Sequence, residues 1–298
     1  MSDSGTPNAV VEAVNVTKRF GDQNVLRGLD FTVAPGEIVL LMGPNGAGKS
    51  VFVSCLSGSA TPDGGTITLF DELTPRAARP AVSTMFQGAM ADPDLTGREN
   101  LQFYEALHPN GTGRWRELVT RLEIEDDLDR VVGDYSGGMQ RKLEIAITLS
   151  LDVPFYVLDE PTIELDLATI RELHDLLLGM RTAGKTVLIT SHAPLDAQIA
   201  DRIVFVRDGK VIASDAPRTL IETLPPVLRV RGTLPPENDL LGGRVFRRGD
   251  EIRGFLEGSD AFDEIRTNLE MKGADLVDID RPSYTDLFNY YTYVHANE

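Results

Sequence analysis

The stretch IVLLMGPNGAGKS, residues 38–50, decides the fold of this 298-residue chain. Residues 38–42 are five consecutive apolar residues, which suits a buried strand, and a helical pattern begins at about residue 48. The segment between strand and helix, residues 43–50, fits the spacing G-x-x-x-x-G-K-[ST] of a phosphate-binding loop. A strand, such a loop and a helix in this order predict an α/β domain that holds the phosphates of a nucleotide.

Each residue type in this loop suits phosphate chemistry. The three glycines allow a tight turn whose backbone N–H groups point at phosphate oxygens. Lys49 is expected to reach the β- and γ-phosphates, and the Ser50 hydroxyl is expected to ligate Mg²⁺. A glycine-rich turn without a ligand is the alternative, but the flanking strand and helix favour the nucleotide. The predicted ATP contacts of the loop are Gly43, Pro44, Asn45, Gly46, Ala47, Gly48, Lys49, Ser50 and Val51.

A second buried strand supplies acids. In FYVLDEPTIELD, residues 155–166, an apolar run ends in Asp159 and Glu160. Parallel strands deliver the side chains at their carboxyl ends to the ligand-binding crevice. Asp159 is therefore expected near Mg²⁺, and Glu160 is expected to hold or deprotonate the attacking water. An acid pair in a surface turn is the alternative, although such a turn would not follow so apolar a strand.

The remaining pattern predicts a flexible N-terminus followed by two domains. Apolar and polar residues alternate in three early segments, which predicts an antiparallel sheet with one exposed face: 9–16, 29–33 and 65–70. Further central parallel strands are predicted at 155–158 and 187–189, and helices at about 48–58, 97–107, 114–123, 137–151 and 167–182. The main domain is expected to span 9–222, after a flexible N-terminus at 1–8.

A change in composition at 224–226, Leu-Pro-Pro, predicts a small α+β domain over 226–298. Its expected elements are strands at 227–232, 244–258 (with a turn at 248–250) and 274–280, a helix at 261–273, and a second helix that starts with Pro282.

Composition limits the possible partners. A formal net charge of −17 is unfavourable for binding nucleic acid through phosphates, so no nucleic-acid partner is expected. The chain has no apolar run of 18 residues and no secretory signal at its N-terminus, so no membrane span is expected. The single cysteine suits a reducing cytoplasm. The acid excess, with six lysines and 23 arginines, resembles proteins of salt-accumulating microbes; an ordinary acidic protein is the alternative.

The segment YSGGMQRKLEIA, residues 135–146, resembles the LSGGQ signature of ABC ATPases. Ser136 can cap a helix, and the two glycines that follow expose N–H groups at its positive end. The resemblance implies that Ser136, Gly137, Gly138 and Met139 contact ATP bound to a second subunit, so a homodimer is expected. It also implies a P-loop ATPase core with an antiparallel β subdomain and a helical subdomain over about 88–150.

The resemblance extends over about 9–220 and implies further roles. These are Phe20 stacking on adenine, Gln87 contacting ATP and Mg²⁺ and coupling to the membrane partner, Asp166 contacting ATP in trans, and His192 contacting the γ-phosphate as a catalytic residue with Glu160 and Lys49. Taken alone, Phe20 would more often belong to a core and His192 would more often be structural.

Four positions depart from the family pattern. Tyr135 and Met139 differ from LSGGQ but resemble drug-exporter variants, and Val51 replaces a common hydroxyl residue. Glu164 stands where the family usually has a glycine. A glycine there would permit positive φ and a close approach across the dimer, so Glu164 raises a question about this loop.

The tail VDIDRPSYTDLF, residues 277–288, is similar to the RxPSLEDVF ending of ATPase subunits in ABC-2 type exporters. The resemblances together imply an ATP-hydrolysing subunit at the cytoplasmic face of the plasma membrane. It would power a separate transmembrane subunit, docked on Gln87 and the helices around 95–125. The alternatives are a non-transport ABC ATPase and a regulatory cassette with little turnover. The tail is expected either to support a dimer or to serve as a stability cap.

Overall fold

The computed structural model describes residues 8–88, 90–232, 241, 245–256 and 262–294. All but the last residue of the predicted flexible N-terminus, 1–8, lie outside the described residues. The chain divides into two compact units, the first ending at Ser214 and the second beginning at Asp215. Each unit has its own sheets and its own core.

A six-stranded sheet forms the centre of the first unit, in the order β5-β6-β7-β3-β8-β9. The strands β5, β6, β7, β3 and β8 are parallel neighbours. The predicted strands β3, β6 and β7 are buried along their whole length, because helices or a second sheet cover both faces. The apolar patterns did not predict β5, β8 and β9. The bounds are β3 Ile38–Met42, β5 Val82–Met85, β6 Phe155–Asp159, β7 Thr186–Ser191, β8 Arg202–Arg207 and β9 Lys210–Asp215.

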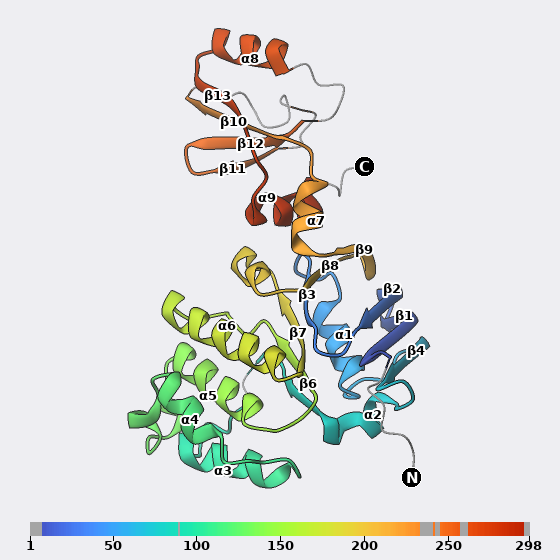
Figure 1. Ribbon diagram of the computed structural model, residues 1–298, viewed down its shortest axis with the longest axis vertical. Helices are drawn as coiled ribbons and strands as arrows, with labels where there is room; N and C mark the ends of the chain where they lie inside the picture. Colours follow the sequence, from blue (N-terminus) through green and yellow to red (C-terminus); the bar gives the residue numbers. More distant parts are fainter. Residues whose placement is uncertain (1–7, 89, 233–240, 242–244, 257–261, 295–298) are drawn as a thin grey trace. The chain divides into compact units, whose positions relative to one another are not determined.

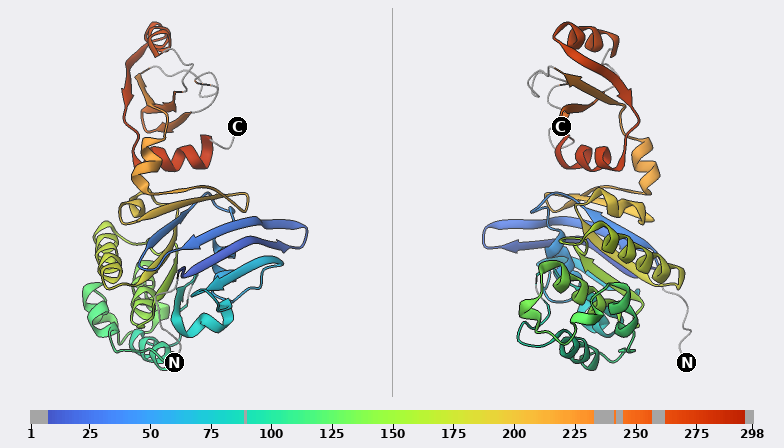
Figure 2. Two further views of the ribbon diagram at one scale, coloured as in Figure 1. Left: turned by 45° about the vertical axis from the view of Figure 1, so that its right-hand side comes forward. Right: turned by 90° about the vertical axis from the view of Figure 1, so that its left-hand side faces the viewer.

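An antiparallel sheet, ordered β2-β1-β4, packs on the central sheet through α1, Lys49–Leu56. It consists of β1 Val11–Phe20, β2 Gln23–Val33 and β4 Gly64–Leu69, as the alternating pattern predicts. Phe31 of β2 meets Phe52 of α1 edge to face, with 5.1 Å between ring centroids. Figure 2 shows this sheet in blue, away from the side of the central sheet that carries α6.

The helices cover the rest of the central sheet. A short helix, α2 Pro75–Ala78, follows the antiparallel sheet. The helices α3 Gly97–Leu107, α4 Trp115–Arg121 and α5 Gly137–Leu149 gather into one subdomain, green in Figure 1, and α6, Leu167–Thr182, lies beside β7. The start of α3 is fixed by a capping box, in which Thr96 and Glu99 exchange hydrogen bonds with each other's backbone.

The second unit is a four-stranded antiparallel sheet, β11-β12-β10-β13, with helices. One face, carrying Leu228, Val230 and Ile252, packs on Leu269 of α8. The other face packs Val227 and Phe255 on the C-terminal helical segment. The bounds are α7 Pro217–Glu222, β10 Val227–Gly232, β11 Val245–Arg248, β12 Glu251–Phe255, α8 Phe262–Met271, β13 Ala274–Asp280, α9 Tyr284–Asn289 and a π-helical segment Tyr290–Val294.

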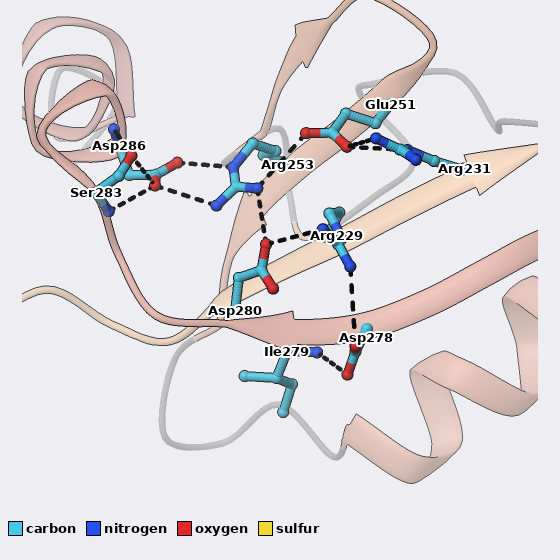
Figure 3. A network of polar contacts seen from close by, with 9 residues as sticks. All are labelled: Arg229, Arg231, Glu251, Arg253, Asp278, Ile279, Asp280, Ser283 and Asp286. Carbon is cyan, nitrogen blue, oxygen red and sulfur yellow. Dashed lines mark hydrogen bonds and ion pairs between the residues drawn. The ribbon is translucent and has the colours of Figure 1, made fainter.

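Arg253 of β12 forms ion pairs with Asp280 and Asp286 of the tail motif, and we call this set of ion pairs the buried lock (Figure 3). Arg253 Nε and Nη2 donate to the two carboxylate oxygens of Asp286 at 2.8 and 3.1 Å, and Arg253 Nη1 donates to Asp280 at 3.0 Å. Asp286 also accepts from the Ser283 amide at 2.7 Å, because Ser283 and Asp286 form the capping box of α9. The prediction that Pro282 begins this helix was wrong by two positions: α9 begins at Tyr284, with Ser283 as its N-cap and Pro282 before that.

Candidate functional site

The phosphate-binding loop joins β3 to α1 and fits only glycine at its first position. Gly43 has φ +154°, and a Cβ there would overlap the carbonyl oxygen of Val206 in β8. Gly48, with φ +104°, is the N-cap of α1, so the first free N–H groups of that helix face the loop. The loop therefore presents backbone donors and the positive end of a helix to one space, as an anion site requires.

Lys49 points back into the loop from the first position of α1. Its Nζ donates to the Gly43 carbonyl oxygen at 2.7 Å and lies 3.7 Å from Glu160 Oε1. Burial lowers the pKa of Lys49, although the neighbouring Glu160 and Asp159 carboxylates raise it. A buried ammonium group at a helix start, beside two carboxylates, is well placed for a ligand that carries several negative charges.

The two acids at the end of β6 differ in their surroundings. The Asp159 carboxylate is buried and accepts a hydrogen bond from the Thr190 hydroxyl of β7. At Glu160 the chain turns sharply, with φ +54°, and the Glu160 amide donates to Thr190 at 3.1 Å. Positive φ at a non-glycine residue costs about 1–2 kcal/mol, and such strain gathers at functional sites. β7 therefore holds both acids in place.

His192, just after β7, meets Glu160 at this point. His192 Nδ1 lies 2.8 Å from Glu160 Oε2, although their alignment is outside that of a hydrogen bond. The His192 side chain is half exposed, while Glu160 is buried. The fold therefore brings Glu160 and His192, which are far apart in the chain, together beside the phosphate-binding loop.

A pocket of about 390 Å³ collects these groups. Its described lining consists of Val25, Asn45, Gly46, Ala47, Gly48, Lys49, Ser50, Val51, Gln87, Glu160, Ile163 and His192. Phe20 is not in that lining: it is exposed near the end of the β1–β2 hairpin, with Lys18 Nζ 5.5 Å from its ring. Asp159 is buried and is not among the described lining residues, but its carboxylate raises the pKa of Lys49. The pocket combines backbone donors, a lysine, a carboxylate and an imidazole.

The signature segment starts α5. Ser136 is the N-cap, and its Oγ accepts from the Met139 amide at 3.3 Å, as the sequence predicts. Tyr135, in place of leucine, is buried, and its hydroxyl donates to the Asp127 carbonyl oxygen at 2.7 Å. Tyr135 therefore makes a hydrogen bond within its own chain that the usual leucine could not make. A second hollow, of about 270 Å³, lies beside this helix start and shares Gln87 and Ile163 with the first.

Glu164 occupies the edge of that second hollow. Its φ is +65°, so the position does adopt the backbone conformation that favours glycine. Its carboxylate lies against the α-carbon of Gly137, and a Cβ on Gly137 would overlap Glu164 Oε2. Glu164, which departs from the family pattern, therefore contacts the signature segment of its own chain.

Sequence reasoning missed a buried link between these parts. Arg141 of α5 donates to the backbone carbonyl oxygens of Asp159 and Glu160, and its Nη1 lies 3.0 Å from Glu144 Oε2. Glu144 in turn accepts a hydrogen bond, at 2.7 Å, from the amide of Met90, which follows Gln87 by three residues. Arg141 and Glu144 lie at helical spacing inside a predicted helix, so the sequence alone gives no sign that they connect α5 to the end of β6. Only their burial in the folded chain reveals this connection.

Asp166 has a structural role within its own chain. Its Oδ1 accepts from the Thr169 amide and its Oδ2 from the Thr169 hydroxyl, both at 2.9 Å, which caps α6. These hydrogen bonds lower the pKa of Asp166. The sequence did not anticipate this cap, although an aspartate before an apolar-periodic segment is a known helix-start signal.

The residues predicted for Mg²⁺ offer suitable ligands. Ser50 supplies a hydroxyl, Gln87 an amide oxygen and Asp159 a carboxylate, and Mg²⁺ prefers such oxygen ligands. Ser50 and Gln87 line one pocket, and the buried Asp159 carboxylate accepts a hydrogen bond from the Thr190 hydroxyl. This donor set fits the ion.

The parallel sheet, the glycine loop at a helix start and the acids at the end of β6 define a P-loop ATPase. A family model described as ABC transporter matches residues 26–163. The chain belongs to the ABC transporter family, as an ATP-binding and ATP-hydrolysing subunit.

Relatives with curated names support this assignment. A protein of Burkholderia orbicola (strain AU 1054) named Nod factor export ATP-binding protein I is 40% identical over 223 residues, which cover 72% of this chain and 73% of the relative. A protein with the same name from Rhizobium meliloti is 35% identical, over 72% of this chain and 67% of the relative.

Solved structures agree. An ATP-binding cassette described as a dimer in a post-hydrolysis state, bound to ADP and Pi, matches with a TM-score of 0.65 and 27% identity, over 70% of this chain and 99% of that one. An ATP-binding subunit of an ABC transporter also has a TM-score of 0.65 and covers 88% of this chain and 99% of its own; at 22% identity this match supports the fold alone. In the described part of the chain, no helix is both long and apolar enough to cross a bilayer.

Proposed function

We propose that this chain powers export by binding and hydrolysing Mg²⁺-ATP between two copies of itself. The observation that carries the proposal is the convergence of Lys49, Glu160 and His192 on one pocket at the phosphate-binding loop. The relatives named as export ATP-binding proteins support the direction of transport.

The residues of the pocket divide the reaction between them. Backbone N–H groups of the loop and the Lys49 ammonium would bind the β- and γ-phosphates. Glu160 would hold the attacking water and take its proton, and His192, 2.8 Å away, would contact the γ-phosphate. Mg²⁺, held by Ser50, Gln87 and Asp159, would neutralise charge on the phosphate oxygens. Phe20, which is exposed at the end of β1, would stack on the adenine.

The signature segment would complete the site of a second copy. Its helix start presents Ser136, Gly137 and Gly138, and α5 has no acidic residue in its first turn. Backbone N–H groups at such an end favour a phosphate. Met139 and Asp166 would lie at the same interface. Two copies arranged head to tail would then share two ATP molecules.

A groove on the helical subdomain suits a transmembrane subunit. Its lining comes from β5, α3 and α5 and includes Met90, Tyr104 and Leu107. Phe103 and Leu107, one turn apart on α3, are 49% and 64% exposed. Nε2 of His108, also in the lining, is buried and has no hydrogen-bond partner among the described residues. An apolar segment of the partner would fill this groove, and one free carbonyl oxygen of that segment would accept a hydrogen bond from His108 Nε2.

The groove lies next to Gln87, the residue proposed to contact ATP and Mg²⁺. Met90, in its lining, is three residues after Gln87 and donates its amide to Glu144. A transmembrane subunit docked here would sit beside Gln87, which would contact the bound nucleotide and Mg²⁺. It would also hold this chain at the cytoplasmic face of the plasma membrane.

Co-expression and co-purification with a candidate transmembrane subunit test the docking proposal. We expect Leu107→Asp and His108→Phe to reduce recovery of the complex while the ATP affinity of the isolated chain stays unchanged. Met271→Asp, at a residue 78% exposed in the second unit, is the matched surface control. Full recovery with both groove variants would contradict the docking site.

A further inference from the structure

A buried carboxylate outside the pocket joins the two segments that carry Glu160 and His192. Asp196 lies four residues after His192, in the 3-10 helix Pro194–Gln198, and is 1% exposed. Both of its oxygens are used within the described residues. His174 Nε2 of α6 lies 2.8 Å from Oδ1, and the hydroxyls of Ser191 and Thr162 lie 2.5 and 2.9 Å from Oδ2.

These three partners come from different parts of the site. Thr162 is two residues after Glu160, Ser191 is the last residue of β7 just before His192, and His174 belongs to α6. The Ser191 hydroxyl also accepts from the Ala193 amide at 2.9 Å, so it binds the backbone on the far side of His192. The chain on both sides of His192 is thereby held to the loop after Glu160.

We infer that Asp196 is a positioning residue for hydrolysis: it fixes the distance between Glu160 and His192. This inference rests on the proposed roles of those two residues. Glu160 and His192 meet at 2.8 Å without a well-aligned hydrogen bond, so their own contact does not fix their geometry. The buried carboxylate does, because three donors converge on it in a region from which water is excluded.

A buried polar group can contribute to stability alone, so turnover and melting temperature must be measured together to distinguish a structural role from a positioning role. A structural role predicts a lower melting temperature with unchanged turnover by the molecules that remain folded. A positioning role predicts a lower kcat, because small displacements of catalytic groups cost up to about 100-fold in rate. ATP affinity should be unaffected in both cases, since the loop 43–50 makes no hydrogen bond to Asp196.

The test is a double-mutant cycle on the purified full-length chain, measured as phosphate release at saturating ATP. We expect Asp196→Asn to lower kcat by about 10- to 100-fold. We expect the double variant Asp196→Asn/His192→Ala to be no slower than His192→Ala, because the two residues act through one group. Turnover of Asp196→Asn at the wild-type rate, or losses that multiply in the double variant, would overturn the inference.

Two further pairs keep the result interpretable. His174→Gln retains an N–H donor and should keep more activity than His174→Leu. If Asp196→Asn does not fold, His174→Leu takes its place in the double-mutant cycle. Ser150→Ala removes another buried hydroxyl, which donates to the Ile147 carbonyl oxygen at 2.7 Å, and should leave kcat unchanged. Glu160→Gln and His192→Ala in the same assay separate the failures. If both retain turnover, the proposed roles fail; if only Asp196→Asn retains it, this inference alone fails.

Discussion

The Glu164 carboxylate lies against the α-carbon of Gly137, at the start of the signature helix of its own chain. The Glu164 carbonyl oxygen would also lie 2.9 Å from a Cβ placed on Gly138. In the proposed dimer these glycines receive the phosphate of the opposite ATP. A carboxylate at the same helix end would repel that phosphate, and salt would weaken the repulsion.

Replacing Glu164 separates the effects of its charge and its backbone. We expect Glu164→Gln to raise ATP-dependent dimer formation about fivefold at low ionic strength, with a smaller gain at high salt. Glu164→Gly should do the same and should also suit the φ of +65°. Sedimentation with Mg²⁺-ATP, in the Glu160→Gln background to prevent turnover, measures the effect. Equal dimer formation by Glu164 and its Gln variant at every salt concentration would contradict it.

The phosphate-binding loop predicts a sharp difference between two glycines. Gly43→Ala would force its Cβ into the Val206 carbonyl oxygen at an unfavourable φ, so we expect ATP affinity to fall at least about tenfold. Gly179→Ala, at an exposed helix position with nothing within 4 Å of the new Cβ, should instead stabilise the chain by about 0.5–1 kcal/mol. Calorimetric titration with ATP checks the first and thermal unfolding the second. Unchanged affinity in Gly43→Ala would exclude a loop held this tightly.

The buried lock of the second unit predicts local stability. Asp286→Asn leaves Arg253 buried with one partner weakened, and breaking such pairs typically costs about 3–5 kcal/mol. We expect faster hydrogen exchange in β10, β12 and α9, while exchange in β3 and β6 of the first unit stays unchanged. Arg266→Gln, which removes an exposed ion pair with Glu270, serves as the control. Full protection in Asp286→Asn would mean that the lock does not stabilise this unit.

The net charge of −17 predicts a response to salt. If the acid excess is an adaptation to a salt-rich cytoplasm, the free energy of unfolding should rise steadily as KCl is added, because ions screen self-repulsion. Denaturant unfolding over a range of KCl concentrations measures this. A chain that is fully stable at low ionic strength would be an ordinary acidic protein.

The sequence predicted what local patterns determine. The glycine loop, the apolar strands before it and before Asp159, and the Ser136 cap all depend on neighbours within a few residues. The contacts between distant segments were visible only after folding. His174, Asp196 and Thr162 are separated by 12 residues or more and read individually as ordinary polar residues. Similarly, Glu164 was recognised as unusual, but its contact with Gly137 follows from the packing of α5 against the loop before α6.

Phosphate release by Glu160→Gln is the most direct test of the central claim, that Glu160 activates water beside an ATP held by Lys49. The variant keeps the size of the side chain and removes its ability to accept a proton. We predict that it binds Mg²⁺-ATP as tightly as the wild type and loses about 100-fold or more in turnover. An ATP-bound Glu160→Gln chain that releases phosphate at the wild-type rate would contradict the account.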